Sequence, residues 1–139
     1  MLTIGKLAAI AHVTPDTLRY YEREGLIEPA GKSAGGYRLY GDSDLGRLHF
    51  IRQAQECGFT LAEIRTLLSL RSRETARCGE VRALAEEKKR QLEDKIKAMR
   101  AMTRTLDRLI ATCDDAGQPV GRCPILSAFN GNGMKQTQR

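Results

Sequence analysis

Between Gly79 and Thr112 the chain contains no proline and no further glycine, a composition that favours one uninterrupted helix over residues 79–112. Its seam positions are Leu92, Ile96, Met99, Thr103, Leu106 and Ile110. These positions alternate in steps of four and three, which is the spacing of a coiled coil. A solitary helix of this length would leave its apolar seam in water, and the rest of a 139-residue chain is too short to cover it. The sequence therefore predicts a homodimer that pairs through this helix.

Two shorter helices are expected near the start of the chain, separated by a tight turn. The first follows Thr3 and carries apolar residues at helical spacing as far as Ala11. The second begins at Thr14-Pro15-Asp16-Thr17, where a threonine hydroxyl caps free N–H groups, proline needs no N–H, and aspartate suits the positive helix end. Gly25 then ends this helix. Two short helices around a tight turn predict a helix-turn-helix.

The next segment, residues 30–40, changes character. Three glycines mark turns, and the run Tyr37-Arg38-Leu39-Tyr40 favours extended chain, so we expect a small β-hairpin, or wing. A helix capped by Asp42 or Ser43 should follow and close at Gly58. Together these elements predict a winged helix-turn-helix.

The net charge of +6 permits a polyanionic partner but does not locate one. Residues 1–56 carry seven basic and seven acidic side chains, so the case for DNA rests on the motif. The candidate DNA contacts lie on the second helix and the wing: Thr14, Thr17, Arg19, Tyr20, Tyr37, Arg38 and Tyr40. In the competing interpretation Arg19 only pairs with Glu22, three positions along the same helix face, and the tyrosines lie at the edges of the core.

Four cysteines in a chain without an export signal favour metal chemistry over structural disulfides. Cys113 and Cys123 bracket nine residues, whereas Cys78 lies 35 positions before Cys113, about 50 Å away along a helix. The three thiols therefore cannot meet within one chain. If two such helices pair antiparallel, Cys78 of one chain arrives beside the cysteine pair of the other. Three thiolates suit soft divalent ions such as Zn, Cd, Pb or Hg.

The other potential ligands receive a plainer interpretation. We expect Cys57, which lies near a helix end, to be a small buried side chain. His12 and His49 are expected to be structural or surface residues. The metal site is therefore expected to consist of Cys78, Cys113 and Cys123.

The expected fold is mainly α: a winged helix-turn-helix followed by a long, antiparallel coiled-coil dimerisation helix. The capping box Thr60-x-x-Glu63 adds one more helix to the N-terminal part of the chain, residues 1–70, which we call the head. The expected parts are a winged helix-turn-helix DNA-binding domain (1–70), a linker (71–78), the dimerisation helix (79–112), a metal-binding loop with a short helix that starts at Pro124 (113–130), and a disordered tail (131–139).

The chain resembles the MerR family of bacterial transcription regulators, particularly its zinc-, cadmium- and lead-responsive branch. The resemblance is carried by TPDTLRYYEREGL (14–26), GGYRLYGDSDLGRL (35–48), FIRQAQECGFTLAEI (50–64) and the three cysteines, the last of which is followed by PIL. It implies a homodimer that binds a palindromic promoter and, once metal is bound, distorts the DNA so that RNA polymerase can initiate. It also implies DNA contacts by Arg19, Tyr20, Arg38 and Tyr40.

Comparison within that family bears on the ion. Copper(I)-sensing members usually carry serine where this chain has Cys78, so the resemblance implies a divalent ion. Similar zinc sensors have a further cysteine and a histidine in the loop, where this chain has Asp114 and Gln118. That difference leaves one three-cysteine site at each end of the dimer, closer to the cadmium, lead or mercury pattern.

Other functions are less well supported. Asp114 and Asp115 are adjacent on a loop, and there is no phosphate-binding glycine loop, so we expect no enzyme. No apolar run is long enough to span a membrane, and the start of the chain lacks a secretion signal, so a cytoplasmic protein without a membrane partner is expected. The alternatives are a related regulator that senses Cu(I) or a small molecule, and a cysteine-based metal carrier that does not bind DNA.

Overall fold

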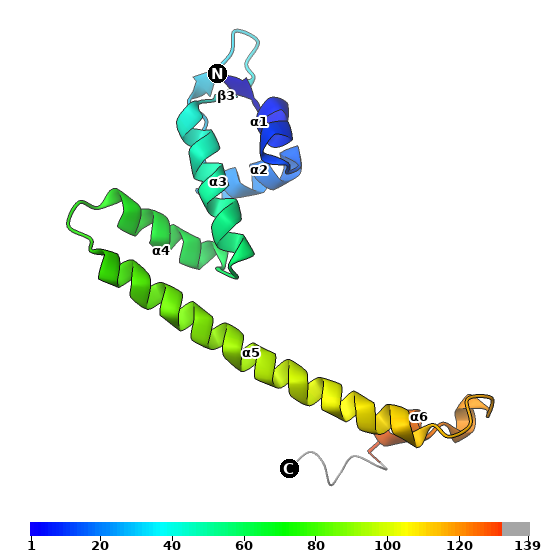
Figure 1. Ribbon diagram of the computed structural model, residues 1–139. Helices are drawn as coiled ribbons and strands as arrows, with labels where there is room; N and C mark the ends of the chain where they lie inside the picture. Colours follow the sequence, from blue (N-terminus) through cyan, green and yellow to red (C-terminus); the bar gives the residue numbers. More distant parts are fainter. Residues whose placement is uncertain (132–139) are drawn as a thin grey trace. The chain divides into compact units, whose positions relative to one another are not determined.

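The computed structural model describes residues 1–131 and contains two compact units, Met1–Lys88 and the residues from Lys89 onward (Figure 1). The predicted disordered tail lies, from residue 132, outside the described residues. The elements are β1 (Leu2–Thr3), α1 (Ile4–Ala11), α2 (Pro15–Arg23), β2 (Gly31–Lys32), β3 (Arg38–Tyr40), α3 (Asp42–Glu56), α4 (Leu61–Ser72), α5 (Cys78–Thr112), a 3-10 turn (Val120–Arg122) and α6 (Pro124–Phe129). The described chain is mainly helical, as predicted.

The helix-turn-helix is confirmed, and its ends are set by the expected caps. The Thr3 hydroxyl accepts a hydrogen bond from the Lys6 amide at 3.3 Å, and the Thr14 hydroxyl accepts one from the Thr17 amide at 3.1 Å. These bonds satisfy amides that a helix start leaves without an intrahelical partner. Gly25 follows α2 with a φ of 74°, a left-handed conformation that glycine adopts without a steric penalty.

The predicted wing is present, and it belongs to a three-stranded antiparallel sheet in the order β1-β3-β2. Leu39 on β3 pairs with Gly31 on β2, which forms the hairpin. On its other side β3 pairs with β1, so that Leu2 lies opposite Tyr40. Strand β1 was not predicted, because two residues are too few to show the alternation that identifies a strand.

The start of α3 differs by one residue from the prediction. Gly41 is the N-cap, and the Asp44 carboxylate accepts a hydrogen bond from the Gly41 amide at 2.8 Å. The cap is therefore supplied from inside the helix rather than by Asp42 or Ser43. The capping box of α4 is confirmed: Thr60 N–H donates to Glu63 Oε1 at 2.8 Å, and Glu63 N–H donates to the Thr60 hydroxyl at 3.2 Å.

The core of the first unit joins α2 to the helices around it. Tyr21, on the inner face of α2, donates a hydrogen bond from its hydroxyl to Gln55 on α3 at 2.7 Å. The core residues are Leu7, Ala8, Leu18, Tyr21, Leu26, Ile27, Tyr40, Leu48, Ile51, Ile64 and Leu68. This anchoring leaves the opposite face of α2 exposed.

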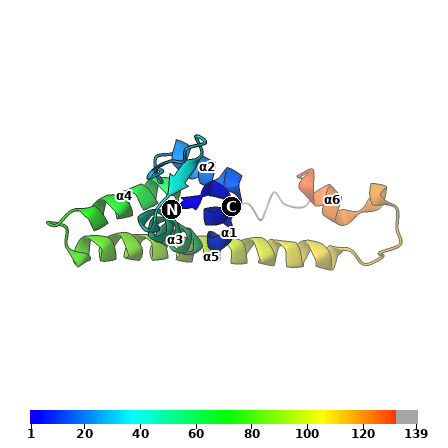
Figure 2. The ribbon, with the colours of Figure 1, turned by 90° about the horizontal axis from the view of Figure 1, so that it is seen from above.

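Helix α4 lies alongside the first part of α5, as Figures 1 and 2 both show. Buried Lys88 forms an ion pair with Glu63 at 2.9 Å, and Arg73 pairs with Glu80 at 3.5 Å. A hydrogen bond from the Thr60 amide lowers the pKa of Glu63 most, and a hydrogen bond from Lys88 has the next largest effect; together they bring this pKa to about 2. The connection between the helices is shorter than the expected linker, since α4 continues to Ser72 and α5 begins at Cys78.

The second unit contains the rest of α5 and α6. Its seam residues Leu92, Ile96, Met99, Leu106 and Ile110 are exposed in the single chain. Buried apolar side chains come from both helices, Leu109 on α5 and Ala128 on α6. None of the helices in residues 1–131 is both long and apolar enough to cross a membrane.

Candidate functional site

The exposed face of α2 carries two of the predicted DNA contacts, Arg19 and Tyr20. Arg19 pairs with Asp16 at 2.9 Å and not with Glu22, so the competing interpretation named the wrong acidic partner. The Asp16 side chain is 92% exposed, and a pair this exposed contributes little free energy. Arg19 can therefore exchange this carboxylate for another anion at little cost.

The N-terminus of α2 presents the predicted threonines. Their hydroxyl oxygens lie 2.8 Å apart, with Thr14 exposed and Thr17 half-buried. Arg23, one turn after Arg19, lies over the Tyr20 ring with its guanidinium carbon 5.9 Å from the ring centroid. Arg23 was not among the predicted contacts, although its spacing of four from Arg19 could have placed it on the same helix face.

The wing residues divide between surface and core. Tyr37 and Arg38 are exposed, and Arg38 donates to Glu22 Oε2 on α2 at 2.7 Å. Tyr40 is 0% exposed and belongs to the core. The prediction of Tyr40 as a DNA contact is therefore corrected: side chains alternate along β3, and this position faces inward.

A recess of about 390 Å³ gathers Arg19, Arg23, Arg38 and Glu22 where α2 meets the wing. Three arginines and one glutamate give it a formal charge of +2. Guanidinium groups bind phosphate oxygens through charge-assisted hydrogen bonds. Residues 1–56 are neutral overall, but three of their five arginines line this recess, at the surface that the motif predicts for DNA.

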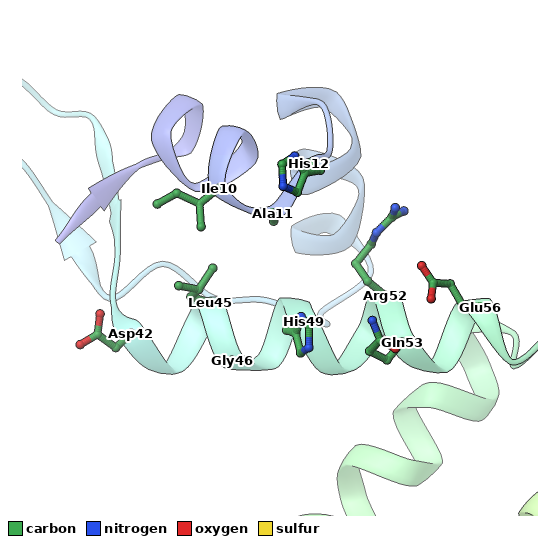
Figure 3. A pocket seen from close by; sticks show the side chains of 10 residues that line it. All are labelled: Ile10, Ala11, His12, Asp42, Leu45, Gly46, His49, Arg52, Gln53 and Glu56. Atoms are coloured by element: carbon green, nitrogen blue, oxygen red, sulfur yellow. The ribbon is translucent and has the colours of Figure 1, made fainter.

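A second recess, of about 690 Å³, lies between α1 and α3 (Figure 3). Ile10 and Leu45 lie on opposite sides of it, while His12 and His49 project from different elements. Both histidines are exposed, in line with the expectation of structural or surface residues. Within residues 1–131, no three Cys, His, Asp or Glu side chains gather closely enough to hold a metal ion.

The four cysteines are all free thiols. Cys57 is exposed at the C-cap of α3, so the expectation that it is buried is wrong: the helix ends there and its cap points outward. Cys78 is exposed at the first residue of α5, and Cys113 and Cys123 are half-buried beyond its last residue. At about 1.5 Å per residue the length of α5 is about 50 Å, so a single chain does not unite the three thiols.

Backbone hydrogen bonds shape the loop between Cys113 and Cys123. The Gly117 amide donates to the Asp115 carboxylate at 3.0 Å, and the Cys123 amide donates to the Val120 carbonyl at 3.1 Å. Two half-buried thiols, those of Cys113 and Cys123, therefore flank this loop as soft donors. Thiolates of this kind fit Zn, Cd, Pb or Hg better than Mg or Ca, which prefer oxygen.

Known proteins resemble this chain over nearly its full length. The HTH-type transcriptional regulator ZntR of Escherichia coli (strain K12) is 43% identical over 130 residues, which cover 93% of this chain and 92% of ZntR. Heavy metal-dependent transcription regulator 2 of Rhizobium meliloti (strain 1021) is 38% identical and covers 97% of this chain and 90% of its own. The crystal structure of the transcription regulator PbrR691 from Ralstonia metallidurans CH34 in complex with Lead(II) matches with a TM-score of 0.81 and 40% identity, covering 93% of this chain and 99% of PbrR691.

Two family models account for the head and the long helix. The model of the MerR HTH family regulatory protein matches residues 2–70, and the model described as MerR, DNA binding, matches residues 45–109. These models describe DNA-binding transcription regulators and not enzymes. The chain belongs to the MerR family of helix-turn-helix regulatory proteins.

Proposed function

We propose that this protein is a metal-responsive transcription regulator, which binds a palindromic promoter as a homodimer and activates transcription by RNA polymerase when a soft divalent ion binds. The observation that carries the proposal is the separation of Cys78 from Cys113 and Cys123 by the full length of α5. Support also comes from relatives described as heavy metal-dependent or solved with lead(II).

The exposed seam of α5 supports an antiparallel dimer. Pairing two copies would bury apolar side chains such as Ile96 and Met99, which are exposed in the single chain. It would also bring Cys78 of one copy beside Cys113 and Cys123 of the other. Each end of the dimer then has three thiolate ligands for one ion of the Zn, Cd, Pb or Hg type.

In the head, α2 enters the major groove and the wing lies along the phosphates. Arg19 and Tyr20 act from α2, with Thr14 and Thr17 at its N-terminus, and Tyr37 and Arg38 act from the wing. Cys78 of one copy and Cys113 and Cys123 of the other would together hold the ion, and would so cross-link the two copies. The cross-link favours one arrangement of the two heads, and hence one geometry of the promoter that they hold.

A mixed dimer tests the shared site. One chain carries Cys78→Ser and the other carries Cys113→Ser with Cys123→Ser; the two are co-expressed with different tags, and the heterodimer is isolated. Neither homodimer should retain a divalent ion well, since each of its sites lacks at least one thiolate. In the heterodimer one end combines both defects and the other is intact, so about one ion per dimer should be recovered. No recovery over the homodimers would refute the shared site.

A further inference from the structure

We propose that Glu22 is a positioning residue of the DNA interface, which holds the guanidinium of Arg38 against α2 so that its remaining N–H groups face a phosphate. The proposal deepens the proposed function and rests on it. It concerns the one acidic side chain in a recess otherwise lined by arginines.

The geometry of the pair is asymmetric. Arg38 Nη1 lies 2.7 Å from Glu22 Oε2, and the side chain of Glu22 is 12% exposed whereas that of Arg38 is 52% exposed. The carboxylate is thus set into the protein surface, with the guanidinium outside it. The second carboxylate oxygen, Oε1, is buried and has no hydrogen-bond partner among the residues that the structure describes.

A carboxylate in this place has an electrostatic cost. It lies in the recess with Arg19 and Arg23, where a phosphate would approach, and like charges at short range repel. A DNA-binding surface would gain from losing this charge unless the carboxylate orders a cation that contacts DNA. Its ion pair with Arg38 provides such an ordering role.

The guanidinium can serve both partners at once. Arginine has five N–H donors in a planar fork, and in Arg38 one of them donates a hydrogen bond to Glu22. The remaining donors can reach a phosphate while the pair stays intact. Because Glu22 already restricts the side chain, less rotamer freedom is lost when DNA binds. The pair also joins α2 to the wing, because Glu22 and Arg38 are 16 positions apart in the sequence.

The test uses the full-length protein and a duplex that the wild type has selected from a randomised pool. The key variant is Glu22→Gln, which keeps the size of the side chain and removes its charge. Asp16→Asn is the matched control, since Asp16 is also an acid on α2 paired with an arginine but is almost fully exposed. Arg38→Ala and the double variant Glu22→Gln/Arg38→Ala complete a cycle. Affinity is measured across a salt series, with far-UV circular dichroism and Tm as folding controls.

Simple charge removal predicts tighter binding for both Glu22→Gln and Asp16→Asn. A positioning role predicts that Asp16→Asn binds as tightly as wild type or tighter, whereas Glu22→Gln binds about tenfold more weakly per head. Loss of one phosphate contact per head should also lower the slope of log K against log salt by about 0.9 for each head. In the Arg38→Ala background, Glu22→Gln should cause no further loss.

The opposite results overturn the proposal. Unchanged or tighter DNA binding by folded Glu22→Gln would show that the carboxylate does not position a side chain that contacts DNA. Losses that multiply in the double variant would show that Glu22 acts without Arg38, and a changed base preference would indicate direct readout. If Glu22→Gln fails to fold, Glu22→Asp replaces it, because its shorter, still charged side chain should weaken binding and lower the salt slope; wild-type values of both would refute the proposal. A wild type that selects no duplex would instead refute the proposed function.

Discussion

The ion pair between Glu63 and Lys88 should contribute measurably to the stability of the head. Glu63→Gln keeps an amide oxygen that can still accept from the Thr60 amide, but it removes the charge that faces Lys88 at 2.9 Å. Lys88 is buried, so its charge loses a partner that water does not fully replace. Glu63 is 38% exposed, and solvent therefore screens part of the attraction. We expect a loss of about 1 to 2 kcal/mol in the free energy of unfolding, which is below the roughly 3 to 5 kcal/mol of a fully buried pair because Glu63 is partly exposed.

The pH dependence of this loss gives a second, independent readout. The pKa of Glu63 is lowered from 4.5 to about 2 in the fold, so its contribution to stability is complete above pH 4.5 and declines as the pH falls toward 2. Urea unfolding of wild type and Glu63→Gln at equal protein concentration measures the difference. At pH 7 it should correspond to roughly 3 to 8 °C in Tm, and it should shrink steadily below pH 4.5. Equal stabilities at pH 7, or a difference that is the same at pH 3, would refute the reasoning.

Three further predictions concern DNA, metal and the dimer. Arg19→Ala should weaken promoter binding and reduce its salt dependence while leaving the number of bound ions unchanged, as measured by gel shift and metal analysis; wild-type affinity across the salt series would exclude Arg19 from the interface. Cys78→Ser should abolish the transcriptional response to divalent ions while Cu(I) binding by Cys113 and Cys123 persists; an unchanged dose-response would remove Cys78 from the site. Ile96→Asp should place a charge in the seam and shift sedimentation toward the monomer; a fully dimeric variant would contradict pairing through this face.

Local signals predicted most of the helices. Thr14 and Thr60 cap α2 and α4 as expected, because a cap depends on residues within one turn of each other. The start of α3 shows how far such signals reach: the cap is one residue earlier, where Asp44 reaches back to the Gly41 amide. Strand β1 could not be predicted, because it exists only by pairing with β3, far along the chain.

The sequence motif indicated candidate residues for the DNA interface, but it did not predict their contacts or their burial. Arg19 and Arg38 follow from the motif, whereas the pairing of Arg38 with Glu22 depends on how the wing packs against α2. The orientation of Tyr40 and the exposure of Cys57 depend likewise on the tertiary fold. Sequence spacing did separate Cys78 from Cys113 correctly, since the rise of a helix is fixed.

A metal titration of the wild-type dimer on its promoter tests the central claim most directly. Zn, Cd, Pb and Hg salts are added in turn, and thiolate-to-metal absorption and transcription by RNA polymerase are recorded in the same samples. We predict that at least one ion raises both signals together and saturates near two ions per dimer, one at each end. Saturated thiolate absorption with no change in transcription for any of the four ions would contradict a metal-responsive regulator.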